Sequence, residues 1–159
     1  MKIASALPLF IRINRKLEKI EVDLSHARRA AEIASGHGTE EAFYLDDSMG
    51  RSLHNIYCGI EGILEDIAID IDGARPGGAR YHADLLDQMT SDTPIRPAAI
   101  PDSPELRDLM RFRHFFRNLY GDPLRRDDLL EKVAVVENRI IPDMMNALQK
   151  VLIAMEGEP

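Results

Sequence analysis

Apolar residues recur every three or four positions along nearly the whole chain, which is the spacing of one face of an α-helix. The first run predicts a long helix over residues 7–34, with apolar positions Ile13, Leu17, Ile20, Leu24, Ala27 and Ala31. A Ser-Gly-His-Gly segment follows and ends it, because glycine is the usual residue just past a helix. Thr39, before two glutamates, is then expected to cap the second helix.

The second helix has the most regular pattern and ends in a Gly/Pro-rich loop at residues 73–78. Its apolar face is formed by Leu53, Ile56, Tyr57, Ile60, Ile63, Leu64, Ile67 and Ile71. A polar stripe contains His54, Cys58, Glu61 and Glu65. Carboxylates on such a stripe need partners if they are buried. We expect Glu61 either to orient His114 or to pair with an arginine, and a plain ion pair is the structural alternative.

Three further helices follow from the same spacing. Residues 81–89 predict a short helix, and the proline-rich residues 93–101 predict an extended connection. A helix should begin near Asp102–Glu105, with an Asp or Ser cap and a proline in its first turn, and end at Gly121–Pro123. The last helix spans about residues 126–154, where Pro142 is expected to cause a kink.

These elements predict an all-α fold: a single-domain antiparallel helical bundle of four long helices and one short helix. The domain covers residues 1–159, with its core at about 40–155 and the first helix within 1–38. That first helix either makes a dimer contact or caps the bundle. Its regular spacing favours contact with a partner.

The helix containing residues 107–120 carries the candidate chemistry. Its polar stripe comprises Arg107, Arg111, His114 and Asn118, with Arg117 at the edge, and its opposite face comprises Leu109, Phe112, Phe116 and Leu119. Guanidinium groups bind phosphate oxygens bidentately, and an imidazole exchanges protons near neutral pH. The stripe therefore predicts a phosphate-handling surface. The alternative is a solvated face, or a salt-bridge layer against an acidic helix.

Charge is distributed unevenly along the chain. The formal net charge is −7, which argues against a general nucleic-acid coat protein. Between residues 107 and 126, however, six arginines stand against only two aspartates. A local basic patch on an acidic protein fits a small site better than a long groove. With 45% hydrophobic residues, the chain can also form a substantial core.

Cysteine usage and hydropathy bear on the compartment and on metals. Cys58 is the only cysteine, which excludes an intramolecular disulfide and favours a reducing compartment. We find no signal-peptide or membrane-span pattern and expect a cytoplasmic protein without membrane contact. His54 and Cys58 lie four residues apart, but two ligands do not make a metal site. We expect neither a metal nor a cofactor.

Several segments together resemble the HepT-like branch of the HEPN superfamily over about residues 40–155. The resemblance rests on residues 53–65, Tyr81-His82 with Leu85-Leu86, Ile95-Arg96-Pro97 and, most specifically, residues 112–121. It implies a helical bundle that commonly dimerises. It also implies a metal-independent ribonuclease toxin paired with a minimal nucleotidyltransferase antitoxin.

The motif of that superfamily is an arginine, often followed by a polar residue, with a histidine four to six residues further on. Arg107 and His114 approximate this spacing. Arg117-Asn118 resembles the start of the motif, although His114 here precedes it. The resemblance therefore implies that His114 and Arg117 work in a permuted order. It also makes Tyr120 the candidate tyrosine for modification with AMP by the antitoxin.

The combined prediction is a metal-independent endoribonuclease toxin subunit of a type II toxin–antitoxin system, cutting RNA at a homodimer interface. Metal-free cleavage needs a proton-transfer group and cations near the phosphorus. The assigned residues are His114 as acid/base, Arg117 and Arg111 as phosphate clamps with Arg107 beside them, Asn118 as a positioning donor and Glu61 in support.

Two other functions remain open on the sequence alone. One is a non-catalytic HEPN-like binding module that partners a minimal nucleotidyltransferase through its arginine face. The other is a purely structural bundle in which carboxylates neutralise Arg107, Arg111 and Arg117.

Overall fold

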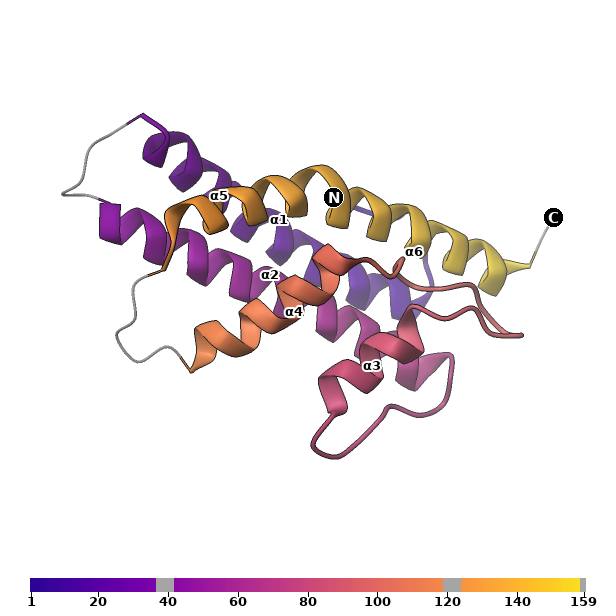
Figure 1. Ribbon diagram of the computed structural model, residues 1–159. Helices are drawn as coiled ribbons and strands as arrows, with labels where there is room; N and C mark the ends of the chain where they lie inside the picture. The colour runs from indigo at the N-terminus through magenta and orange to yellow at the C-terminus, as the bar shows by residue number, and fades with distance from the viewer. Residues whose placement is uncertain (37–41, 119–123, 158–159) are drawn as a thin grey trace.

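The computed structural model describes residues 1–36, 42–118 and 124–157. Its helices are α1 (Pro8–Ala34), α2 (Ala42–Asp70), α3 (Tyr81–Met89), α4 (Pro104–Arg117), α5 (Arg126–Val135), a π-helical turn η1 (Val136–Ile140) and α6 (Ile141–Glu156) (Figure 1). Because α5, η1 and α6 follow one another without a break, these ranges contain four long helical rods, one short helix and no strand. The predicted all-α fold is confirmed. The expected cap at Thr39 and helix end at Gly121 lie outside the described residues.

The helices α1 and α2 form a long antiparallel pair. Arg12 contacts Asp70 at 2.5 Å near one end, and Lys16 contacts Asp66 at 2.6 Å one turn further along. Gly59 lies against Ile20 in the middle of the pair, where a Cβ on the glycine would come within 2.7 Å of the Ile20 Cγ1 atom. The absence of a side chain at residue 59 therefore sets how closely the two helices approach.

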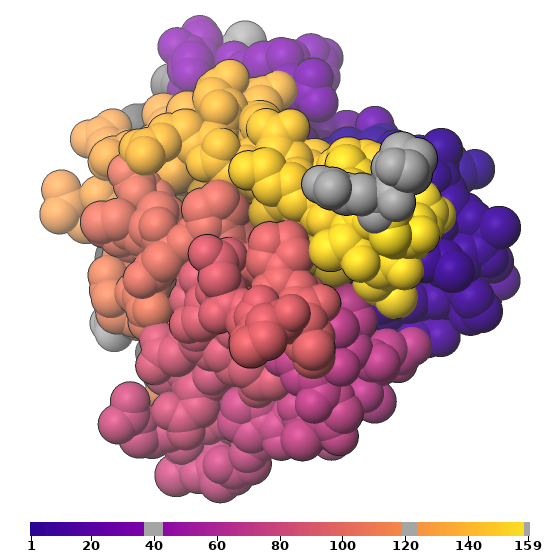
Figure 2. Space-filling view, turned by 90° about the vertical axis from the view of Figure 1, so that its right-hand side faces the viewer, coloured from indigo at the N-terminus to yellow at the C-terminus, as the bar shows by residue number. Residues whose placement is uncertain are grey.

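Helices α3, α4 and α5 also pack against α2. In Figure 1, α4 crosses α2 and lies between α3 and the rod formed by α5 and α6. The apolar face predicted for α4 is turned inward: Leu109 and Phe112 are buried, and Phe116 packs against the core. In the space-filling view, α6 in yellow fills the surface between α1 in indigo and the α3–α4 connection in red (Figure 2).

Pro142 is accommodated by a widened turn. The five residues of η1 directly precede α6, and the Ile141 N–H donates to the carbonyl of Val136, five residues back. Proline lacks a backbone N–H and crowds the preceding turn, so one π-helical turn gives its ring room while the rod continues. The sequence predicted a disturbance at this place and described it as a kink.

The α3–α4 connection is anchored by a buried arginine. The Arg96 guanidinium donates to both carboxylate oxygens of Asp72, at 2.7 and 2.6 Å. Its remaining N–H groups donate to the carbonyls of Gln88, Ser91 and Pro97. This one side chain therefore ties the connection to the ends of α2 and α3.

The glycines of α2 give a first prediction. Gly59→Ala should lower the free energy of unfolding by a net amount of up to about 2 kcal/mol, because overpacking against Ile20 costs about 1–3 kcal/mol and the gain in helix propensity offsets up to about 1 kcal/mol. Gly62→Ala is the matched control: its Cβ would meet only the flexible Lys16 side chain, at 3.4 Å or more, so this variant should be neutral or more stable. Urea unfolding of both variants measures the difference. Equal effects would contradict the close approach.

The buried Arg96–Asp72 pair gives a second prediction. Burial alone would raise the pKa of Asp72, but hydrogen bonds from Arg96 and Gln88 hold that pKa below its ordinary value. The pair therefore stabilises the fold above pH of about 4, the pKa of an unfolded aspartate, and loses this contribution as the pH falls through the lower folded pKa.

Arg96→Met should consequently lower the free energy of unfolding by about 3–5 kcal/mol at neutral pH, because Asp72, whose side chain is only 12% exposed, loses its charged partner. The difference from wild type should shrink as the solution is acidified below pH of about 4. Urea unfolding across this range measures both effects. A small loss that does not depend on pH would contradict the account.

Candidate functional site

The helix that carries the candidate chemistry begins where the sequence predicted. The Ser103 hydroxyl accepts a hydrogen bond from the Leu106 N–H at 3.1 Å, and Pro104 occupies the first turn. The last turn carries His114 and Arg117, where the negative end of the helix dipole favours positive charge. The C-terminal turn of α4 therefore favours the positive charge of Arg117.

The predicted polar stripe of α4 is largely exposed, but its members differ in how strongly they are already bound. Arg107 is held by Asp87 at 2.8 Å and by Asp102 at 2.7 Å. Arg111 makes only a 3.5 Å contact with Asp108 and is two-thirds exposed. The neutralisation expected of a purely structural bundle is thus strong at Arg107 and weak at Arg111.

At the end of the stripe, the Asn118 amide donates to the carbonyl of His114 at 2.8 Å. Within the described ranges, the His114 side chain has no hydrogen-bond partner, and Arg117 has no ion-pair partner. Both side chains are exposed, so they can reach a ligand from solvent. Tyr120, the candidate modification site, lies outside the described residues.

Glu61 has two partners, and only one is of the expected kind. Its carboxylate contacts Arg113 of α4 at 3.4 Å, which confirms the expectation of an arginine. The other partner is His82 of α3, at 2.5 Å, and not His114. His114 follows Arg113 by one residue, which is about 100° further around the helix. Its imidazole consequently projects into solvent while Arg113 reaches inward.

The geometry of this cluster determines where the proton lies on His82. Arg113 Nη1 lies 3.0 Å from His82 Nε2, and a guanidinium can only donate. Nε2 must therefore accept, which leaves the imidazole proton on Nδ1, where it is donated to Glu61 Oε1. The His82 ring is therefore held between a carboxylate and a guanidinium.

Neighbouring contacts hold α3 and α4 against α2. The Tyr81 hydroxyl donates to Glu65, one helical turn beyond Glu61. Burial, with that hydrogen bond in addition, raises the pKa of Tyr81 to about 12. On the α4 side, the His54 ring packs against Phe116 with their centroids 5.5 Å apart. Burial lowers the pKa of His54 below its ordinary value.

Helices α3 and α4 enclose a groove of about 340 Å³, here called the α3–α4 groove. It is lined by Ala79, Arg80, His82, Ala83, Met110, Arg111, Arg113 and His114. Two of the predicted site residues, Arg111 and His114, therefore meet three that were not assigned. Within the lining, three guanidinium groups and two imidazoles surround the cavity without a carboxylate. Such a lining suits an anion.

Two sequence signals pointed to the unassigned residues. Arg113 directly follows the buried Phe112, and a cation that close to an apolar face needs an acidic partner if it is covered. Glu61 is the acidic residue beside the apolar face of α2, as Arg113 is the basic residue beside the apolar face of α4. His82 lies in one of the segments that carry the family resemblance.

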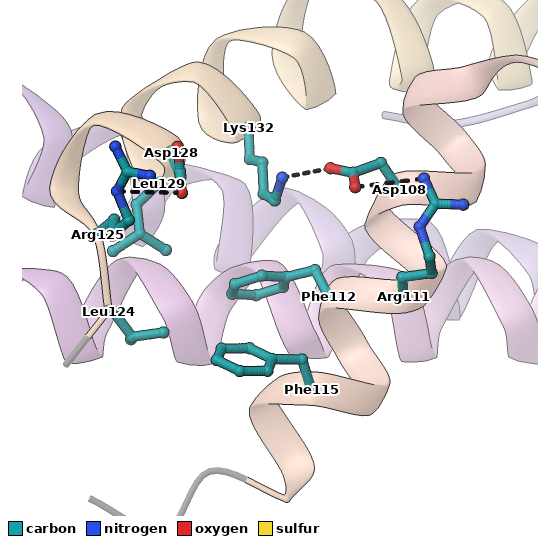
Figure 3. Close-up of a pocket in the computed structure, with 9 residues that line it drawn as sticks. All are labelled: Asp108, Arg111, Phe112, Phe115, Leu124, Arg125, Asp128, Leu129 and Lys132. Atoms are coloured by element: carbon teal, nitrogen blue, oxygen red, sulfur yellow. Dashed lines mark hydrogen bonds and ion pairs between the residues drawn. The ribbon is translucent and has the colours of Figure 1, made fainter. Parts of the chain in front are cut away.

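A second groove lies on the other flank of α4, against α5 (Figure 3). Its apolar lining consists of Phe112, Phe115, Leu124 and Leu129. Asp108 contacts both Lys132 and Arg111, and Asp128 contacts Arg125, as the dashed lines in Figure 3 show. Because Asp108 and Asp128 themselves line this groove, whereas no carboxylate lines the α3–α4 groove, the second groove is less suited to phosphate.

Comparison with known proteins assigns the family. The model of a family described as "HepT-like protein" matches residues 48–155. This range includes all of the α3–α4 groove and most of α2. The chain belongs to this HepT-like family of the HEPN superfamily. No curated protein and no solved structure matches the chain. Among the described helices, none combines the length and apolar character needed to cross a membrane.

The contact between Tyr81 and Glu65 gives a third prediction. Glu65→Gln should lower the pKa of Tyr81 from about 12 toward the ordinary value of about 10, because the anionic acceptor is lost. The carbon-13 shift of the Tyr81 ring against pH measures it. Glu18→Gln, at an exposed position of α1, is the control. An unchanged Tyr81 pKa in the Glu65 variant would contradict the docking of α3 described above.

Proposed function

We propose that the protein is a metal-independent endoribonuclease, the toxin subunit of a type II toxin–antitoxin system. The observation that carries the proposal is an exposed histidine, His114, in a groove lined with arginines that retain free N–H donors. Membership of the HepT-like family supports the same class of function. The substrate is an RNA phosphodiester, bound with its phosphate in the α3–α4 groove.

Arg111 and Arg117 form the proposed phosphate clamp. Both are exposed at the same end of α4 as His114, and Arg111 is held by only one long contact. Arg80 reaches the groove from the other side, where it makes only a 3.6 Å contact with Asp84. Guanidinium groups so placed can turn toward the non-bridging oxygens of a phosphodiester.

Arg107, which the sequence also placed in the clamp, is the least supported of these residues. Two carboxylates already occupy its donors, and hydrogen bonds to Asp102 and Asp87 raise its pKa. A phosphate would have to displace both aspartates. Its role in the proposal is therefore to fix the start of α4 against α3.

The reaction requires no metal ion. A base removes the proton from the 2′-hydroxyl, the 2′-oxygen attacks phosphorus, and the 5′-oxygen leaves with a proton. The products are a 2′,3′-cyclic phosphate and a free 5′-hydroxyl. His114 takes part in this proton transfer, and the arginines stabilise the charge that builds on the phosphate oxygens. Asn118 holds the turn from which His114 projects.

The proposal includes two protein partners and a place of action. Two copies of the chain bring their α4 helices together, which concentrates basic groups on a protein of net charge −7. A minimal nucleotidyltransferase is the proposed antitoxin, Tyr120 the residue that it modifies, and the cytoplasm the place of action. The non-catalytic binding module predicts the same partner without cleavage.

The fourth prediction tests this function with His114→Ala. The wild-type protein should cleave RNA in the presence of EDTA and arrest growth when expressed alone. His114→Ala should cleave about 10²–10⁴-fold more slowly, which is the usual contribution of a general acid or base, and should allow growth. His26→Ala, at an exposed histidine of α1, is the matched control and should behave as wild type.

Equal cleavage by His114→Ala and wild type would contradict the assignment of the site. No cleavage and no growth arrest by the wild type would contradict the ribonuclease and favour the binding module.

A further inference from the structure

We infer that His82 is the general base of the cleavage reaction, with Glu61 as its positioning residue. This inference rests on the ribonuclease function proposed above and adds a second proton-transfer group to it. In that proposal only His114 transfers a proton, whereas the reaction moves two. His82 lines the same groove from the opposite helix, α3.

The contacts of His82 place its proton on Nδ1 and leave Nε2 as an acceptor. Its Nδ1–H is donated to Glu61 at 2.5 Å, so the lone pair is on Nε2. A neutral imidazole with one accepting nitrogen is the form that can remove a proton. The carboxylate behind it fixes the tautomer and stabilises the imidazolium that forms after proton transfer.

Glu61 and His82 differ in how far their side chains are exposed. The Glu61 side chain is 9% exposed, whereas the His82 side chain is 37% exposed. Glu61 is therefore held inside the protein as a fixed negative charge, and substrate can reach His82. Burying such a carboxylate without a partner would lower the stability of the folded state. The two partners of Glu61 both line the groove. The arrangement places a buried charge directly behind an accessible imidazole.

Arg113 contacts His82 Nε2 through its Nη1 atom. Its side chain is only 12% exposed, and its Nε–H is buried with no hydrogen-bond partner among the described residues. The terminal nitrogens of the guanidinium contact Glu61 and His82. When a phosphate enters the groove, Nη1 can turn from His82 to a phosphate oxygen, while Nη2 remains near Glu61. That exchange frees His82 Nε2 only when substrate is present.

Two histidines then account for both proton transfers of the reaction. His82 Nε2 takes the proton of the 2′-hydroxyl as the bond from the 2′-oxygen to phosphorus forms. The bond from phosphorus to the 5′-oxygen breaks, and the His114 imidazolium donates its proton to that oxygen. One histidine gains a proton and the other loses one, so no metal or further reactant is required. Proton exchange with water restores both.

The test uses two dinucleotide substrates that differ in the leaving atom. One has the natural 5′-oxygen, and the other has a bridging sulfur, which leaves without protonation. His82→Gln should slow cleavage of both by about 10²–10⁴-fold, because the base is needed in each case. His114→Ala should slow only the oxygen substrate and recover near wild-type rates on the sulfur substrate. His26→Gln is the control for a histidine outside the groove.

The dependence of kcat/KM on pH separates a positioning role from a purely structural one. Wild type should show an acidic limb, from protonation of the base, and His82→Gln should lack it. Glu61→Gln should move that limb and lower kcat, whereas Glu18→Gln should change neither. Circular dichroism melting of each variant checks folding, and His82→Asn serves as a second variant at the same position.

Three outcomes would overturn the inference. Wild-type cleavage of the oxygen substrate by His82→Gln would remove His82 from the reaction and leave the proposed function standing. Recovery of His82→Gln on the sulfur substrate would make His82 the acid. An absence of any cleavage by the wild type would overturn both the inference and the proposed function.

Discussion

The buried carboxylate of Glu61 is the constraint on which the site depends. It lies on α2, against which α1, α3, α4 and α5 all pack, and contacts His82 on α3 and Arg113 on α4. An unpaired charge at this depth would cost several kcal/mol, so both partners must be present in the folded state. The contact thereby fixes where α3 and α4 lie relative to each other. The groove between those helices follows from that placement.

The arginines of α4 differ in how many of their N–H donors are already bound to carboxylates. Arg107 is held by two aspartates and helps to position the helix, whereas Arg111 keeps most of its donors free. Arg113 lies between these cases, because it is buried and paired but retains one N–H without a partner. A site that binds phosphate needs both kinds of arginine. Paired arginines fix the positions of the helices, and arginines with free donors bind the ligand.

Helical periodicity predicted most of the fold, because the three-to-four spacing reports directly which face of a helix is covered. The bounds of α1 and α3 and the Ser103 cap agree with the sequence, and the π-helical turn before Pro142 was expected only as a kink. The cluster around Glu61 was predicted only in part. Periodicity gives the direction of Arg113 on its own helix but not which neighbour covers it. His82 lies on a short helix whose docking depends on tertiary contacts.

The central claim is that one groove brings His82 and His114 to the same phosphodiester. The most direct measurement is the nitrogen-15 spectrum of the imidazoles during titration with a 2′-deoxy dinucleotide, which cannot be cleaved. We expect the resonances of His82 Nε2 and His114 to shift together at one ligand affinity, because Arg113 releases His82 when the ligand binds. The resonances of His26 should not move. Shifts at His114 alone, or equal shifts at all three histidines, would contradict it.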